Sequence, residues 1–170
     1  MSDDPPVSDA AADLFEEARR TEGEDAAAAL SLFAQCAAAE PGWSVPVVAL
    51  GDLLRKSGRT EEALVAYGRA FELDPTDAAI PVKSGNLRNE TRDYATAVWD
   101  YETAAAARPD WYLPDLNRGN ALTAQGNLDG AARAYDRALE KGGPAGIRLR
   151  RDLRLPIIPE GGEPYAAEYE

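Results

Sequence analysis

Small and aromatic residues recur at intervals of 34 positions through most of this chain. Glycine stands at Gly51, Gly85 and Gly119. Three alanines and three tyrosines follow with the same interval: Ala63, Ala97 and Ala131, then Tyr67, Tyr101 and Tyr135. A fixed period of this length is typical of repeat proteins, in which each unit buries its apolar face only against its neighbours. The period therefore limits the fold to a stack of similar units.

Each unit resembles the tetratricopeptide repeat family, in which two antiparallel helices, A and B, form one repeat. The most regular copy carries Leu50-Gly51 in helix A, Ala63-x-x-x-Tyr67 in helix B and Pro75 just after helix B. These residues match the family pattern W-x-x-L-G-x-x-Y, A-x-x-x-F, P. In phase with them we expect four repeats, at residues 10–43, 44–77, 78–111 and 112–145. The resemblance implies an all-α, right-handed α-solenoid of about four helix hairpins.

The repeat pattern also predicts how each hairpin packs. The glycine and alanine positions are expected to be small because helices A and B cross there at close range. The tyrosines are expected to fill the space between helix B and the next repeat. The three tryptophans, Trp43, Trp99 and Trp111, are expected to pack at repeat boundaries.

Prolines and glycines mark the ends of the expected helices. Pro46, Pro81 and Pro114 fall in the first turn of an A helix, where a missing N–H costs nothing. Gly58 and Gly126 fall in the turn between helices A and B, where glycine adopts a positive φ easily. Helix B of the third repeat is expected at about 94–107.

The two ends of the chain lie outside the pattern. Residues 1–9 are acidic and contain two prolines, so we expect disorder there. The last repeat leaves an apolar edge, and Leu149 and Leu153 are spaced to share one face of a short helix. We therefore expect a C-terminal capping segment at 146–158, followed by an acidic tail at 159–170. The alternative is that this segment enters the concave face of its own or a neighbouring molecule.

Composition excludes several classes of function. The net charge is −12, whereas a nucleic-acid partner needs a basic patch, so we expect no nucleic-acid ligand. The chain has no histidine, which removes the commonest general base and metal ligand. We find no phosphate loop, paired catalytic carboxylates or metal-ligand cluster, and expect no enzyme activity, catalytic residue, cofactor or metal. The single cysteine, Cys36, is expected to be a small buried core residue.

The hydropathy pattern gives no sign of a membrane segment. No apolar run approaches the roughly 18–20 residues of a membrane span. The acidic, proline-containing N-terminus is unlike the basic start and apolar stretch of a signal peptide. We expect no membrane partner and a cytoplasmic location.

The resemblance also implies where a ligand binds. In this family helix A lines the concave face, and its second, fifth, ninth and twelfth positions point inward. The candidate peptide-binding groove consists of Val48, Asp52, Arg55, Val82, Asn86, Asn89, Leu116, Asn120 and Thr123. The first repeat would add Ala11, Leu14, Ala18 and Thr21.

The groove residues suit an extended peptide. An asparagine amide both donates and accepts, so Asn86 and Asn120 can bind a peptide main chain. Val48, Val82 and Leu116 are expected to form an exposed apolar floor for peptide side chains. The alternative is that the asparagines only cap or bridge neighbouring A helices.

One known ligand class does not fit. Chaperone-binding members of the family hold a C-terminal carboxylate in a clamp of lysine, asparagine and arginine. The matching places here hold Val48, Asp52, Lys83, Leu113 and Asn117, of which only Lys83 is basic. We expect no strong affinity for acidic chaperone tails.

Three functions follow from this reading. The leading one is a non-enzymatic protein–protein interaction scaffold that binds a peptide or protein segment in the concave groove. The second is a regulatory or substrate-recruiting module of a glycosyltransferase-type enzyme, because residues 148–159 resemble the segment that follows such repeats in some bacterial glycosyltransferases. The third is self-association, in which the acidic N-terminal end meets the arginine-rich residues 148–154.

Overall fold

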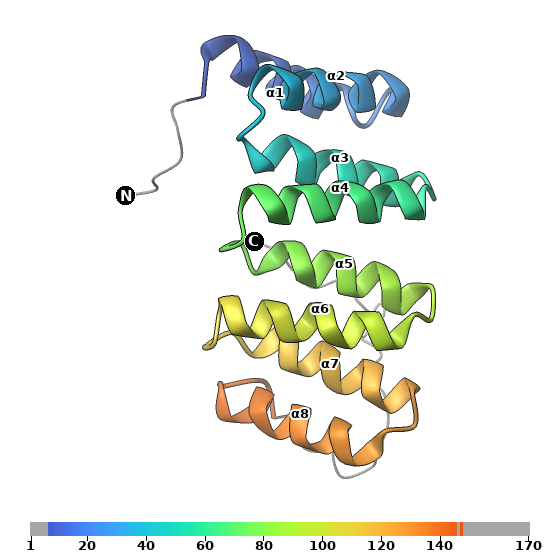
Figure 1. Cartoon of the computed structure of the whole chain (residues 1–170). Helices are drawn as coiled ribbons and strands as arrows, with labels where there is room; N and C mark the ends of the chain where they lie inside the picture. The colour runs from blue at the N-terminus through green and yellow to red at the C-terminus, as the bar shows by residue number, and fades with distance from the viewer. Residues whose placement is uncertain (1–6, 146, 148–170) are drawn as a thin grey trace. The chain divides into compact units, whose positions relative to one another are not determined.

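The structure is a computed structural model, and it describes residues 7–145 and 147 (Figure 1). All regular elements in these residues are α-helices. They are α1 (Asp9–Thr21), α2 (Ala26–Ala39), α3 (Ser44–Lys56), α4 (Thr60–Leu73), α5 (Ala79–Glu90), α6 (Tyr94–Ala107), α7 (Tyr112–Ala124) and α8 (Leu128–Glu140). The predicted all-α class is confirmed. None of the helices in this part of the chain is long and apolar enough to cross a membrane.

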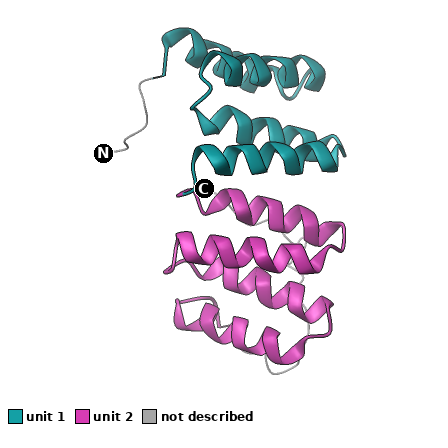
Figure 2. Ribbon diagram, viewed as in Figure 1, with its two compact units in different colours: residues 1–75 teal, residues 76–170 magenta. Residues whose placement is uncertain are grey.

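The chain divides into two compact units, Met1–Pro75 and Thr76–Glu170, coloured teal and magenta in Figure 2. Unit 1 contains the hairpins α1–α2 and α3–α4, and α2 packs against α3. Unit 2 contains the hairpins α5–α6 and α7–α8, and α6 packs against α7. Each unit is described by itself.

The helix boundaries follow the sequence markers. Pro46, Pro81 and Pro114 are each the third residue of an A helix, as predicted. Helix α6 spans Tyr94–Ala107, as expected for helix B of the third repeat.

The turns between helices A and B reveal one position that the sequence did not mark. Gly58 and Gly126 have φ of 72° and 80°, as predicted. The equivalent residue of the α5–α6 turn is Arg92, which adopts φ of 66° without being a glycine. In all three turns this residue donates its N–H to the carbonyl three residues earlier. The hydrogen-bonded turn therefore imposes the left-handed conformation on Arg92, at a cost of about 1–2 kcal/mol.

The centre of three hairpins is a tyrosine ring of helix B resting on a glycine of helix A. A Cβ added to Gly51 would lie 2.7 Å from Cε1 of Tyr67, and one added to Gly85 would lie 2.7 Å from Cε1 of Tyr101. The ring of Tyr135 covers Gly119 in the same way. The glycine is thus required by the ring, a contact inside the hairpin that the sequence analysis did not foresee. Tyr101 also shares a core cluster with Ala121 of α7, so it joins neighbouring repeats as expected.

The residue after each glycine accepts a hydrogen bond from the same tyrosine. The hydroxyl of Tyr67 donates to Asp52 Oδ1 at 2.7 Å. The hydroxyls of Tyr101 and Tyr135 donate to Asn86 Oδ1 and Asn120 Oδ1, both at 2.9 Å. A buried tyrosine hydroxyl needs such a partner. Two consecutive residues of helix A therefore serve one tyrosine, the first by its small size and the second by its oxygen.

The first hairpin departs from the repeat by one residue. Ala18, rather than Glu17 at the glycine position, lies in a core cluster with Ala29 and Phe33. Ala11 and Ala18 are fully buried, so the expectation that they point into a groove is wrong. Cys36 is also fully buried, as predicted, and its Sγ–H donates to the carbonyl of Ala11 at 3.2 Å.

Two of the three tryptophans pack as expected. The ring of Trp43 lies 5.2 Å from that of Phe15, and Trp111 packs against the core cluster of α5 and α6. Trp99 is 62% exposed on α6, so packing at a repeat boundary is the wrong interpretation of this residue.

Ile147 is the last described residue. It is 1% exposed and lies in a core cluster with Leu122, Tyr135 and Ala138. The other residues of the predicted capping segment at 146–158, the predicted tail at 159–170 and residues 1–6 lie outside the described residues.

We predict that Gly51→Ala destabilises the chain although alanine is the better helix former. The added methyl group would overlap the buried ring of Tyr67, and overpacking of this kind costs about 1–3 kcal/mol. Gly68→Ala, in α4 of the same hairpin, is the matched control, because no atom lies within 4 Å of its added Cβ. That control should gain up to about 1 kcal/mol from helix propensity. Urea unfolding followed by helical circular dichroism measures both, and a stabilised Gly51→Ala would contradict the packing.

Candidate functional site

The A helices of unit 2 bring one set of predicted groove residues together. Asn117 Nδ2 on α7 donates to Asn86 Oδ1 on α5 at 3.1 Å. Both asparagines are buried, each 5% exposed. The contact places the α5 residues Val82, Asn86 and Asn89 beside α7, which carries Leu116, Asn120 and Thr123.

Most of the polar groove residues also hold the hairpins together. Asn86 Oδ1 accepts from both Tyr101 and Asn117. Thr123 Oγ1 donates to the Gly119 carbonyl at 2.8 Å and lies 3.2 Å from the Tyr135 hydroxyl. The asparagine at position 86 therefore bridges neighbouring A helices, which is the alternative that the sequence left open.

Asn89 differs from the other amides of this surface. It is 3% exposed, and neither its Nδ2 nor its Oδ1 has a hydrogen-bond partner. An amide that is shielded from water without a partner costs about 1–3 kcal/mol. Asn89 is therefore a buried amide on this face whose two polar side-chain atoms have no hydrogen-bond partner.

The apolar floor is not the exposed row that the sequence predicted. Val82 is fully buried and belongs to the core cluster that contains Ala97 and Tyr101, so the expectation is wrong at this position. Val48 and Leu116 are half-buried. Leu116 packs against the cluster of α7 and α8 and leaves part of its side chain accessible.

In unit 1 the predicted groove residues Val48, Asp52 and Arg55 lie on one helix, α3. Their spacing of four and three residues places them on one face of that helix, and all three are half-buried. Asp52 accepts from the Tyr67 hydroxyl, as Asn86 does from Tyr101. A groove that combines the residues of all repeats stays a prediction.

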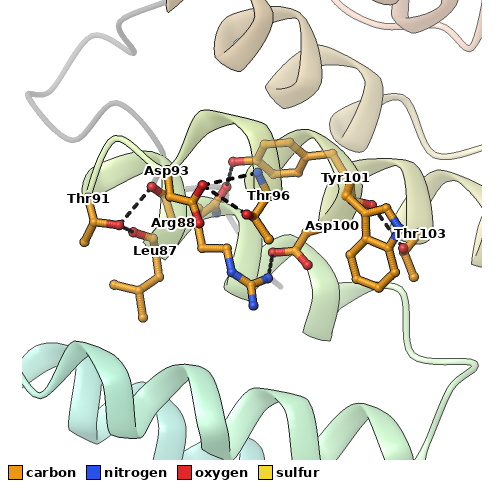
Figure 3. Close-up of polar contacts among 10 residues, drawn as sticks. Leu87, Arg88, Thr91, Asp93, Thr96, Asp100, Tyr101 and Thr103 are labelled. Atoms are coloured by element: carbon orange, nitrogen blue, oxygen red, sulfur yellow. Dashed lines mark hydrogen bonds and ion pairs between the residues drawn. The ribbon is translucent and has the colours of Figure 1, made fainter. Parts of the chain in front are cut away.

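A buried ion pair joins the two helices of the α5–α6 hairpin, and sequence reasoning missed it. The guanidinium of Arg88 contacts Asp100 Oδ2, as Figure 3 shows. Asp100 is 3% exposed, and burial raises the pKa of its carboxyl to about 6. Arg88 opposes this rise in pKa, whereas the charge of Asp93 adds to it. Asp93 itself accepts hydrogen bonds from the N–H and hydroxyl of Thr96 and caps α6 (Figure 3).

A second buried carboxylate lies in the α7–α8 hairpin. Asp115 is 1% exposed and accepts from Lys141 Nζ at 2.6 Å and from Arg137 Nε at 3.1 Å. Arg118 lies 3.5 Å from the same carboxylate. These cations compensate the buried charge, so Asp115 ties α7 to α8. A search of residues 7–145 and 147 finds no group of three cysteine, aspartate or glutamate side chains placed to hold a metal ion.

Comparison with known proteins agrees with the hairpin geometry. The family model described as "Tetratricopeptide repeat" matches residues 47–77. RNA polymerase II-associated protein 3 of Xenopus laevis is 33% identical over 85 residues, which cover 50% of this chain and 13% of that protein. The chain thus spans only a small part of this curated relative.

Solved structures show the same fold. MamA from Desulfovibrio magneticus RS-1 superposes with a TM-score of 0.74 at 17% identity, over 88% of this chain and 85% of that one. The first repeat domain of Spaghetti (RPAP3), bound to the HSP90 peptide SRMEEVD, gives a TM-score of 0.59 at 21% identity, over 65% and 89%.

Stacked helix hairpins with a small residue under an aromatic ring define the class of α-helical repeat proteins. The repeat register, the family match and the solved structures together specify the class further. Residues 47–77 match the tetratricopeptide repeat family, and the described residues have the all-α helix-hairpin fold of tetratricopeptide repeat structures.

We predict that Asp100 makes stability fall as the pH rises from about 4 to about 6. Because its pKa is raised in the folded state, the folded chain binds the proton more tightly than the unfolded chain across this range. The loss from this carboxyl amounts to roughly 2–3 kcal/mol and is complete above pH 6. The variant Asp100→Asn lacks this carboxyl and should not show this loss of stability.

The measurement is urea unfolding of both proteins between pH 4 and pH 7.5. The unfolding free energy of the native chain relative to Asp100→Asn should fall across this range. The contributions of the other carboxylates to the pH dependence are the same in both proteins and cancel in that difference. A difference that rises with pH would show that the ion pair with Arg88 outweighs burial.

Proposed function

We propose that the chain is a non-enzymatic scaffold that binds a protein or peptide segment along the A-helix surface of unit 2. The observation that carries the proposal is Asn89, a buried amide without a partner, on a surface lined by Asn86, Asn117 and Asn120. An extended peptide offers N–H and carbonyl groups in turn, so one peptide unit satisfies both polar atoms of such an amide. The Spaghetti (RPAP3) structure, which contains a bound peptide, supports the same class of function.

The surface favours main-chain recognition over recognition of an acidic C-terminus. Asp52 occupies one of the matching clamp places in unit 1, and its negative charge repels a terminal carboxylate. In unit 2, Asn117 is engaged with Asn86. We therefore propose a peptide without an acidic C-terminal tail as the ligand.

The net charge of −12 supports a protein ligand rather than a nucleic acid. A cytoplasmic location without a membrane partner also belongs to the proposal, and it rests on the hydropathy pattern of the sequence. The residues that suggested a glycosyltransferase partner or self-association, 148–159, lie outside the described residues. Both interpretations stay predictions from the sequence.

A random 12-residue peptide library selected on the immobilised full chain tests the proposal. Peptides that bind should lose at least tenfold in affinity for Asn89→Arg and for Leu116→Arg, because each long cation would fill the A-helix surface. Fluorescence anisotropy with the selected peptides measures the affinities, and circular dichroism confirms that the variants fold.

The matched control is Trp99→Arg, which introduces the same cation at an exposed position of α6. Its affinity should change less than twofold. If the affinity of the selected peptides falls only for Trp99→Arg, the binding site lies on the exposed face of α6 instead. Failure to select any peptide would argue against a peptide-binding scaffold.

A further inference from the structure

A pocket of about 310 Å³ lies among helices α6, α7 and α8, within unit 2 (Figure 1). Each helix lines it with two residues that are four positions apart and therefore share one face of their helix. These residues are Val98 and Glu102 of α6, Arg118 and Leu122 of α7, and Arg133 and Arg137 of α8. Three guanidinium groups thus line one pocket in a chain whose net charge is −12.

A pocket at the same register in unit 1 shows that the repeat does not require these arginines. It lies on the α3–α4 hairpin and has a volume of about 360 Å³. Leu50 and Val65 line it at the positions that Arg118 and Arg133 occupy two repeats later. The lining in unit 1 contains two carboxylates and one arginine, whereas the lining in unit 2 contains three arginines and one carboxylate. The positive charge is therefore particular to the side chains of unit 2.

The arginines of this pocket carry more donors than the neighbouring carboxylates accept. Arg118 donates through one terminal nitrogen to Glu102 Oε1 at 3.0 Å, whereas its buried Nε has no hydrogen-bond partner in the described part of the chain. The exposed Arg133 has no hydrogen bond or ion pair with a described residue. Arg137 donates its Nε to Asp115 Oδ1 at 3.1 Å. Because each guanidinium has five N–H donors, the pocket keeps donors for an additional acceptor.

The remaining lining residues add a neutral donor and an apolar wall. Asn127 Oδ1 accepts from the N–H of Gly130 at 3.0 Å, so the amide NH₂ of Asn127 is the group left to donate. Val98 is half-buried and Leu122 is 9% exposed. An apolar wall keeps water away on one side and strengthens the attraction between the arginines and an anion.

These donors fit a phosphate monoester better than other anions. A guanidinium binds phosphate oxygens in pairs through its planar fork. A phosphate monoester carries about −1.5 to −2 charges at pH 7 and three acceptor oxygens. A carboxylate has a single charge and two oxygens, fewer than three guanidinium groups can serve. A nucleic acid carries many charges, and the net charge of −12 repels it.

We propose that this pocket binds a phosphate monoester group through Arg118, Arg133 and Arg137. The site does not rest on the proposed peptide-binding surface. Arg118 is two residues from both Leu116 and Asn120, and residues two apart do not share a face of a helix. A free phosphorylated small molecule and a phosphorylated side chain of a partner protein offer the same group.

An NMR titration of the ¹⁵N-labelled full chain with inorganic phosphate tests the site. Sodium chloride keeps the ionic strength constant, because salt alone weakens surface ion pairs. The Nε–H signals of arginine report on the guanidinium groups directly. Those of Arg118, Arg133 and Arg137 should shift in a saturable manner with one common dissociation constant. The Nε–H signal of Arg69, which lines the pocket of unit 1, should stay in place.

Two substitutions test the donors. Arg133→Val introduces the residue that α4 carries at the same register, and it should weaken phosphate binding about tenfold, as expected for the loss of one charge-assisted hydrogen bond. Arg118→Lys keeps the charge but removes the Nε donor, and it should weaken binding by a similar factor. The matched control Arg69→Val removes the same charge from unit 1 and should change the affinity less than about twofold. Circular dichroism checks that each variant is folded.

The other outcomes decide against the site or against its ligand. Absence of a saturable shift would overturn the proposal, and so would a native affinity in both Arg133→Val and Arg118→Lys. Acetate that binds as tightly as phosphate would overturn the choice of a phosphate monoester.

Two further probes, methyl phosphate and N-acetyl-phosphoserine methylamide, distinguish the sources of the phosphate. Equal affinities would support the pocket and assign it to a small phosphorylated molecule. An affinity about tenfold tighter for the phosphoserine probe would support the pocket and assign it to a phosphorylated side chain of a partner protein. Failure of both probes to bind would overturn the proposal and leave the peptide-binding surface of α5 and α7 unaffected.

Discussion

The contact between a tyrosine ring and a glycine is the interaction on which three of the four hairpins depend. Gly51, Gly85 and Gly119 allow the ring to rest on the backbone of helix A. The next residue of that helix then lies within reach of the tyrosine hydroxyl and accepts its proton. The apolar ring is thus buried without leaving its polar tip unsatisfied, and helices A and B are fixed both in separation and in register.

This arrangement couples stability to binding along helix A. Asn86 and Asn120 lie on the proposed binding surface, yet both accept the hydroxyl proton that fixes their hairpins. A substitution at either residue would disturb the fold as well as any ligand contact. Asn89 has no such structural role among the described contacts, so it is the residue at which ligand binding separates from hairpin stability. The exposed Trp99 lies on a B helix, α6, and is therefore a control position away from the proposed A-helix surface.

The repeat could be predicted from the sequence because its markers are local. Prolines that fix the first turn and glycines that adopt positive φ act on their own backbone, so their positions alone predicted helix ends and turns. The side-chain partners of a residue depend on distant positions. Arg88 and Asp100 pair across two helices, and no element of the family pattern marks either residue. The hydrogen bonds of the tyrosine hydroxyls were also not predicted, because the family pattern does not mark the residues that accept them. Donor and acceptor nevertheless lie 15 residues apart in every case.

The candidate site was less predictable than the fold. The repeat register alone predicted that Val82 lies on the floor of a groove, whereas the structure buries Val82 in the core. In the first repeat, the register predicted that Glu17 would pack against Phe33. Ala18 packs there instead, because a small apolar residue fits the core and the carboxylate of Glu17 stays in water. The single unsatisfied amide, Asn89, could be found only once the contacts of its neighbours were known.

A double-mutant cycle between Gly51 and Tyr67 tests the central claim most directly. The unfolding free energies of Gly51→Ala, Tyr67→Leu and the double variant are measured against the native chain. If the ring is what requires the glycine, the methyl group should cost at least about 1 kcal/mol less once the ring is removed, a coupling typical of residues in contact. Effects that add within about 0.5 kcal/mol would show that the glycine is needed for another reason and would contradict the account.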